Sequence, residues 1–181
     1  MSKLGNFRSL SEANKANALY QRAEEEWRRG RMRFAFRDML AAAEAGMSAA
    51  FESVAQFYDF GRGTRVDRDA ALYWYRRAHR RGDTSVQNNI GCIWRDRGQL
   101  TRALWWFRRA VELGDGDANM NIAKIYLYER HDLRKASQYL RRAARSAWTT
   151  EGTKEDAQNM LRRLKAGNLP QRARQRTRGQ H

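Results

Sequence analysis

Residues 71–78 read Ala-Leu-Tyr-Trp-Tyr-Arg-Arg-Ala, and the last four of them decide the fold because they return further along the chain. The returning unit is one large apolar residue followed by Arg-Arg-Ala. It recurs as Phe107-Arg108-Arg109-Ala110 and as Leu140-Arg141-Arg142-Ala143, at spacings of 32 and 33 residues. A fixed spacing of that length indicates one supersecondary unit copied along a solenoid, and solenoids mostly present surface to partners.

The same period runs through other positions of the chain. Three small residues and one large apolar residue occupy matching places in four copies. The first small residue is Ala23, Ala55, Gly91 and Ala123. The second is Ala35, Ala71, Ala103 and Ala136, and the third is Ala42, Ala78, Ala110 and Ala143. The large residue, four places after the second small one, is Met39, Tyr75, Phe107 and Leu140.

This pattern predicts helix-on-helix packing. Positions i and i+7 share one face of a helix, so alanines there let a neighbouring helix approach while the large residue fills the remaining space. With a single proline and no strand pattern in the chain, we expect an all-α protein of four antiparallel helix pairs. The alternative is four generic amphipathic helices whose alanines coincide.

Two runs resemble a known repeat family. The runs Asn89–Trp94 and Ala103–Phe107 are similar to the tetratricopeptide pattern. The second copy, with Tyr58–Asp67, Ala70–Ala78 and Gly82-Asp83, resembles the Sel-like branch of that superfamily, which has a longer glycine-bearing loop between its helices. The resemblance covers roughly residues 13–147 and implies a right-handed α-solenoid.

Turn and cap signals predict where the helices lie. The expected helices span 11–29, 32–45, 48–60, 67–81, 84–97, 100–113, 117–129 and 132–146. The expected N-terminal caps are Ser11, Asp67, Thr84, Asp117 and Asp132. The expected C-terminal glycines are Gly30, Gly46, Gly82, Gly98 and Gly114. A capping helix is expected from the capping box Thr153–Asp156 to about Ala166.

These signals divide the chain into three parts. Residues 1–10 are expected to be a flexible segment, and residues 11–166 to form the repeat domain with its capping helix. Residues 167–181 are expected to be a disordered basic tail, because they carry four arginines and no acid. Those arginines are Arg172, Arg174, Arg176 and Arg178.

The cell compartment is inferred from missing signals. No signal-peptide core and no membrane-spanning run occurs, and the single cysteine, Cys92, excludes an intramolecular disulfide framework. We therefore expect a cytoplasmic protein with no membrane partner.

Charge is the second strong signal. The chain has 36 lysines and arginines against 20 acids, a formal net charge of +16. Six arginines repeat on the second helices: Arg76, Arg77, Arg108, Arg109, Arg141 and Arg142. They are either a solvated outer face or a basic surface, together with the tail, for an acidic protein or for nucleic acid phosphates.

The tetratricopeptide resemblance implies that the first helix of each pair lines a concave groove. The groove residues carried over are Ser53, Gln56, Asp59, Phe60, Asn88, Asn89, Cys92, Arg95, Asn121, Lys124 and Tyr128. The same rule places Met120 and Leu127 on this face. Asparagines there can donate to and accept from a peptide backbone, and in relatives Asn and Lys hold peptide carboxylates. The alternative is an ordinary wet helix face.

The sequence gives no support for catalysis. The three histidines, His79, His131 and His181, form no pattern with a nucleophile or a metal set, and Cys92 has no second cysteine. We expect no enzyme activity, no metal or other cofactor, and no small-molecule substrate. Two functions remain: an adaptor that holds a segment of a protein partner in the groove, and a nucleic-acid-binding module that uses the arginines.

Overall fold

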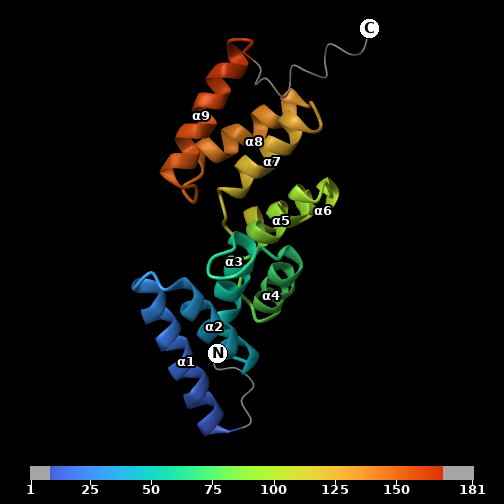
Figure 1. Ribbon diagram of the computed structural model, residues 1–181. Helices are drawn as coiled ribbons and strands as arrows, with labels where there is room; N and C mark the ends of the chain where they lie inside the picture. The colour runs from blue at the N-terminus through green and yellow to red at the C-terminus, as the bar shows by residue number, and fades with distance from the viewer. Residues whose placement is uncertain (1–8, 169–181) are drawn as a thin grey trace. The chain divides into compact units, whose positions relative to one another are not determined.

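The computed structural model describes residues 9–168, and within them the chain contains helices and no strand (Figure 1). These residues divide into two compact units, one ending at Val86 and the other beginning at Gln87. The first unit contains α1 (Leu10–Arg28), α2 (Met32–Glu44), the 3-10 helix η1 (Ser48–Ala50), α3 (Phe51–Phe60) and α4 (Arg68–Arg80). The second contains α5 (Gln87–Asp96), α6 (Leu100–Glu112), α7 (Ala118–Tyr128), α8 (Leu133–Arg145) and α9 (Glu151–Lys165).

The helices pack in the predicted pairs. In the first unit α1 packs on α2 and α3 on α4, and in the second α5 packs on α6, α7 on α8, and α8 on α9. Each pair comes from one copy of the sequence period, and α9 is the additional C-terminal helix. The predicted all-α architecture of helix pairs is therefore confirmed.

The residues that repeat along the sequence are the ones buried between the helices. Every alanine of the repeated small positions, and every large residue of the repeated apolar position, has at most 1% of its surface exposed. Gly91 stands where the other copies have alanine because Phe107 leaves no room: a Cβ on Gly91 would lie 2.6 Å from the Phe107 ring. The alanine and glycine positions therefore set the helix spacing within each unit.

The glycine-bearing loop between α3 and α4 is also explained by a close approach. Gly63 has a φ of +72°, and a Cβ there would overlap the carbonyl oxygen of Met32, the first residue of α2. The loop thus packs directly onto the preceding helix pair, which only glycine permits.

Helix ends are predicted better than helix starts. The five expected C-terminal glycines all have positive φ, as a left-handed helix end requires. Among the starts, Asp67 and Asp132 are confirmed, since their carboxylates accept from the backbone N–H groups of Ala70 and Lys135.

Three predicted starts are wrong, and a fourth has the right position but not the expected side-chain cap. Ser9 rather than Ser11 caps α1, because its hydroxyl accepts from the Glu12 N–H. Asp83 bonds Ser85 in a tight turn that delays α5 to Gln87, so Thr84 does not begin that helix.

The other two cases lie at α7 and α9. Asp117 is the N-cap residue of α7 as predicted, but its carboxylate bonds Thr150 instead of its own helix, and Asp115 accepts from the Ala118 N–H. The capping box at Thr153–Asp156 does not start α9, because Thr150 caps that helix.

Every helix among residues 9–168 is too short or too polar to cross a membrane. The expectations for residues 1–8, and for the tail arginines Arg172, Arg174, Arg176 and Arg178, fall outside the described residues.

Candidate functional site

Polar side chains of α5 and α7 form one connected network in the second unit. The Asn121 Nδ2 donates to the Asn88 Oδ1 at 2.8 Å, and the Arg95 Nη1 donates to the Asn121 Oδ1 at 3.2 Å. Arg95 also donates to the Asp96 carboxylate at 2.9 Å. Four predicted or adjacent polar residues are thus held together across the first helices of two successive pairs.

Asn121 and Asn89 have different roles, although they are equivalent in the sequence period. Asn121 uses both ends of its amide inside the network. Asn89 is half-buried, and no described residue hydrogen-bonds its amide. Lys124, one turn after Asn121 on α7, is half-buried and forms no ion pair with any described residue. The side chains of Asn89 and Lys124 thus have no described partner, whereas the Asn121 amide is held on both sides.

The remaining predicted residues of the second unit lie on the same two helices. Cys92 on α5 and Tyr128 on α7 are half-buried. Met120 and Leu127 are buried, with 5% and 0% of their surfaces exposed, and Met120 belongs to the hydrophobic core shared with α8 and α9. The position rule is wrong for these two residues, because α7 is covered on two sides by neighbouring helices.

In the first unit the predicted residues lie on α3 and are partly used by internal contacts. Gln56 donates to Glu52 at 3.1 Å, and the Tyr75 hydroxyl donates to Asp59 at 3.5 Å. Ser53 is half-buried. Phe60 is 57% exposed, with the Arg62 guanidinium 5.2 Å from its ring centre.

The position rule that gave Ser53 and Gln56 also places Glu52 on this face of α3. Its carboxylate accepts from the Ser85 hydroxyl at 3.2 Å. Burial raises the pKa of Glu52, and the nearby charge of Asp83 raises it further.

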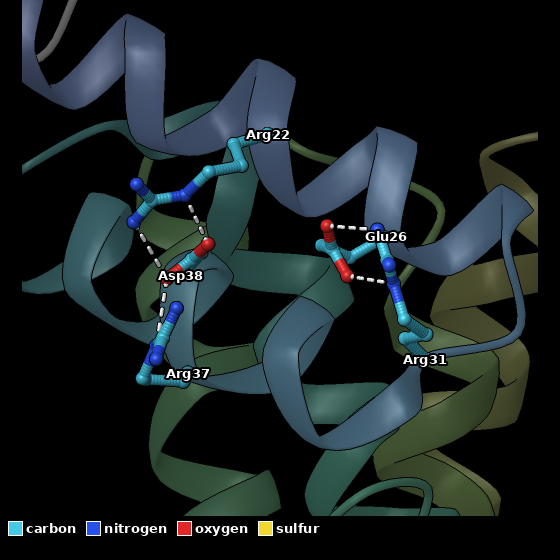
Figure 2. Close-up of polar contacts among 5 residues, drawn as sticks. All are labelled: Arg22, Glu26, Arg31, Arg37 and Asp38. Atoms are coloured by element: carbon cyan, nitrogen blue, oxygen red, sulfur yellow. Dashed lines mark hydrogen bonds and ion pairs between the residues drawn. The ribbon is translucent and has the colours of Figure 1, made fainter.

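An ion pair with a buried carboxylate joins α1 and α2, and our sequence analysis did not indicate it. Asp38 is only 2% exposed, and its carboxylate accepts hydrogen bonds from Arg22 and Arg37 (Figure 2). A second pair, Arg31 with Glu26, lies nearby on the same two segments (Figure 2). Asp38 stands three places after Ala35, where the other copies carry Trp74, Trp106 and Tyr139. A charge at an aromatic position was therefore the available signal.

The repeated arginines do not all form a solvated outer face. Arg77 is half-buried, with its guanidinium 4.4 Å from the Phe51 ring centre and 4.7 Å from that of Trp74. Arg108 donates to the Tyr126 hydroxyl, and Arg109 pairs with Glu112. Arg76 and Arg141 are exposed, and Arg142 is exposed and lies over the Tyr139 ring. Several of these side chains therefore hold helices together as well as carrying charge.

No group of three or more His, Cys, Asp or Glu side chains in the part of the chain that the structure describes has a geometry suited to a metal ion. His131 takes a positive φ of 54° in the turn before α8.

No protein-family model matches the sequence, and no curated protein is significantly similar to it. The structure is similar to that of a Sel1 repeat protein from Oxalobacter formigenes, with a TM-score of 0.64 and 21% identity over 91% of this chain and 70% of that chain. It is similar to a protective antigen with an SLR fold from uropathogenic Escherichia coli, with a TM-score of 0.65 and 18% identity over 85% of this chain. This chain spans 35% of that antigen.

An immunity protein from Pseudomonas aeruginosa matches with a TM-score of 0.36 and 17% identity over 85% of this chain and 83% of that protein, a similarity too weak to support an argument. The two stronger matches agree with the helix pairs, the buried alanines and the glycine-bearing loop. The chain therefore has the fold of the Sel1-like repeat proteins, an all-α solenoid.

Proposed function

We propose that this protein is a non-enzymatic protein-interaction module that binds a segment of a partner protein against α5 and α7. The observation that carries the proposal is the contrast on α5 and α7 between the fixed network of Asn88, Asn121 and Arg95 and the free side chains of Asn89 and Lys124. A fixed polar surface loses little conformational entropy when a ligand binds.

The chemistry of the free groups suits a peptide. The Asn89 amide can donate to a backbone carbonyl and accept from a backbone N–H, so it binds an extended segment without requiring one particular side chain. The Lys124 ammonium adds attraction for a carboxylate. The basic exterior of the second helices supplies a further surface for acidic partners.

This binding mode fits an adaptor, an assembly scaffold, a chaperone-like protein or the neutraliser of a toxin. All four roles require a protein segment at the α5 and α7 surface, so the first test concerns that surface.

The test is affinity capture by the full chain from nuclease-treated lysate, followed by a binding measurement with the purified partner. We expect one stoichiometric protein to remain bound, and we expect Asn89→Ala with Lys124→Ala to weaken its affinity at least about tenfold. Asn14→Ala with Lys15→Ala is the matched control, since it removes the same residue types from an exposed part of α1.

Two outcomes contradict the proposal. Recovery of bound material only in a parallel capture without nuclease shows that nucleic acid is the ligand. Unchanged partner affinity in the Asn89 and Lys124 variant, with an unchanged melting temperature, excludes the α5 and α7 surface.

A further inference from the structure

Helix α8 carries a concentration of positive charge that the α5 and α7 surface does not use. The helix contains five basic residues and no acid. Arg141 and Arg145 are exposed, and no described residue forms an ion pair with either. Strong unpaired charge on one helix indicates a surface that attracts anionic groups.

The same two arginines separate two neighbouring depressions. One has a volume of about 600 Å³ and is lined by Arg141, Arg142 and Arg145 together with Val111 and Asn119. The other has a volume of about 360 Å³ and lies between α8 and α9. Its lining includes Arg141 and Arg145 again, with Leu161 and Lys165. Neither lining contains an acidic residue.

A buried acceptor without a partner lies in the larger depression. Asn119 is 4% exposed; its Nδ2 donates to the Gly116 carbonyl at 3.1 Å, while its Oδ1 accepts from no described residue. If the Asn119 Nδ2 and Oδ1 were exchanged, the amide oxygen would face the Gly116 carbonyl oxygen, and two acceptors would repel each other. The observed orientation is therefore the favourable one. A buried acceptor without a donor costs free energy, which a ligand N–H bound in this depression would recover.

We propose that these two depressions form a second binding surface, which takes an acidic peptide segment of a partner protein. Carboxylates satisfy Arg141 and Arg145, often by two hydrogen bonds each. A backbone N–H satisfies Asn119, and an apolar side chain fits against Val111 or Leu161. Phosphodiester groups supply negative charge but only acceptor atoms, so they leave Asn119 without a donor. The inference rests on the proposed role in protein binding and assigns it a second site with its own ligand chemistry.

An exposed aromatic side chain adjoins the surface. Trp148 is 79% exposed and follows Ser146, which lines the larger depression. The Ser146 hydroxyl accepts from the Trp148 N–H at 3.1 Å, and this bond fixes the start of the loop. Arginine and exposed tryptophan together are the residue types that contribute most to protein interfaces.

The experiment measures fluorescence anisotropy of a labelled peptide of alternating Glu, Asp and Leu residues, titrated with the full chain at physiological salt. The competing probe is an oligothymidylate of the same net charge. We expect the peptide to bind more tightly than the oligothymidylate, and Arg141→Gln with Arg145→Gln to weaken the peptide at least about tenfold. Arg33→Gln with Arg65→Gln is the control, because it removes the same charge from exposed residues of the first unit.

The outcomes separate this inference from the proposed function. The Asn89→Ala and Lys124→Ala variant should bind the acidic peptide as wild type does, because its substitutions lie on α5 and α7. Peptide binding that survives the loss of Arg141 and Arg145, or no peptide binding at all, overturns the inference. Oligothymidylate binding at least as tight as the peptide, lost in the same double variant, identifies the surface as a nucleic acid site instead.

Discussion

Arg22 on α1 binds the carboxylate of Asp38 on α2, with its Nη2 donating to the Asp38 Oδ1 at 2.9 Å. The hydrogen bond from Arg22 lowers the pKa of Asp38 below its ordinary value, and the hydrogen bond from Arg37 lowers it further against the opposing effect of burial. A carboxylate whose folded-state pKa is lowered stabilises the fold above its unfolded pKa of about 3.9. That stabilisation is lost as the pH falls through the folded-state value.

We predict that Arg22→Gln lowers the free energy of unfolding at pH 7, because it removes the main partner of a buried charge. The difference from wild type should begin to shrink below a pH of about 4 and should vanish only below the lowered folded-state pKa of Asp38, where the carboxyl is protonated in both proteins. Urea unfolding of both proteins, followed by circular dichroism at neutral and at low pH, measures this difference in the free energy of unfolding. Arg28→Gln, which breaks an exposed pair with Glu25, should change the free energy by less than about 1 kcal/mol. An equal loss for Arg22→Gln at low and neutral pH would contradict the explanation.

The contribution of Glu52 to the free energy of unfolding should depend on pH in the opposite way to that of Asp38. Burial raises its pKa, the charge of Asp83 adds to the effect, and the hydrogen bonds from Ser85 and Gln56 only partly oppose it. A raised folded-state pKa means that the fold is favoured below the unfolded pKa of about 4.3, and that this contribution is lost as the pH rises through the folded-state value. At pH 7 the ionised Glu52 therefore destabilises the first unit.

We predict that Glu52→Gln raises the free energy of unfolding at pH 7 by less than about 1 kcal/mol, since the side chain is half-exposed and solvent screens its charge. The amide keeps an oxygen for the Ser85 hydroxyl. The gain should disappear at pH 3, where Glu52 is protonated in the wild type. Thermal unfolding at both pH values is the measurement, with Glu155→Gln on the exposed face of α9 as the control. A gain that persists at pH 3 would show that charge is not its cause.

Gly91 and Gly152 offer a matched pair for the packing argument. Both are helical glycines, but a Cβ on Gly91 would lie 2.6 Å from the buried Phe107 ring, while a Cβ on Gly152 meets nothing within 4 Å. Overpacking a core costs about 1–3 kcal/mol, whereas alanine in an open helix position gains up to about 1 kcal/mol over glycine.

We therefore predict that Gly91→Ala destabilises the protein and that Gly152→Ala is neutral or stabilising. Guanidinium unfolding of the two variants beside wild type gives the comparison. If both substitutions raise the free energy of unfolding alike, Gly91 does not limit how closely α5 approaches α6.

The helix pairs were predictable because the sequence signals that specify them lie within each helix. Alanines seven residues apart and a large residue between them specify a buried helix face, and Gly30 or Gly98 specifies a helix end without reference to the rest of the chain. The wrong cap predictions depend instead on residues far away in the sequence. Asp117 has the right residue type and place for a cap, but its oxygen bonds Thr150, which lies 33 residues later. Only the packing of the next helix decides between the two partners.

The sequence predicted which helices carry the candidate site, but not the contacts within it. The period indicated Asn89 and Asn121 as equivalent, and both lie on the expected helices. Which amide stays free depends on the offset between α5 and α7, which brings Asn121 against Asn88. The offset depends on side-chain volumes in two helices, so the period alone does not give it. For the same reason Asp38 was visible as an acid at an aromatic position, whereas its partner Arg22 was not.

Thr150 links the start of α9 to the preceding pair of helices. Its hydroxyl accepts from the Thr153 N–H at 3.4 Å and donates to the Asp117 carboxylate at 3.1 Å. Its backbone N–H donates to the same carboxylate at 3.0 Å. One side chain thus caps α9 and holds it to the beginning of α7.

We predict that Thr150→Val, which keeps the shape but removes the hydroxyl, lowers the free energy of unfolding by about 1 kcal/mol, because the cap and the bond to Asp117 are both lost. Amide hydrogen exchange should show the loss of protection concentrated in the first turn of α9. The control is Thr101→Val, at an exposed position in the first turn of α6, which should change stability by less than about 0.5 kcal/mol. Equal effects of the two substitutions, or unchanged exchange in α9, would mean that α9 is held by its apolar contacts with α8 alone.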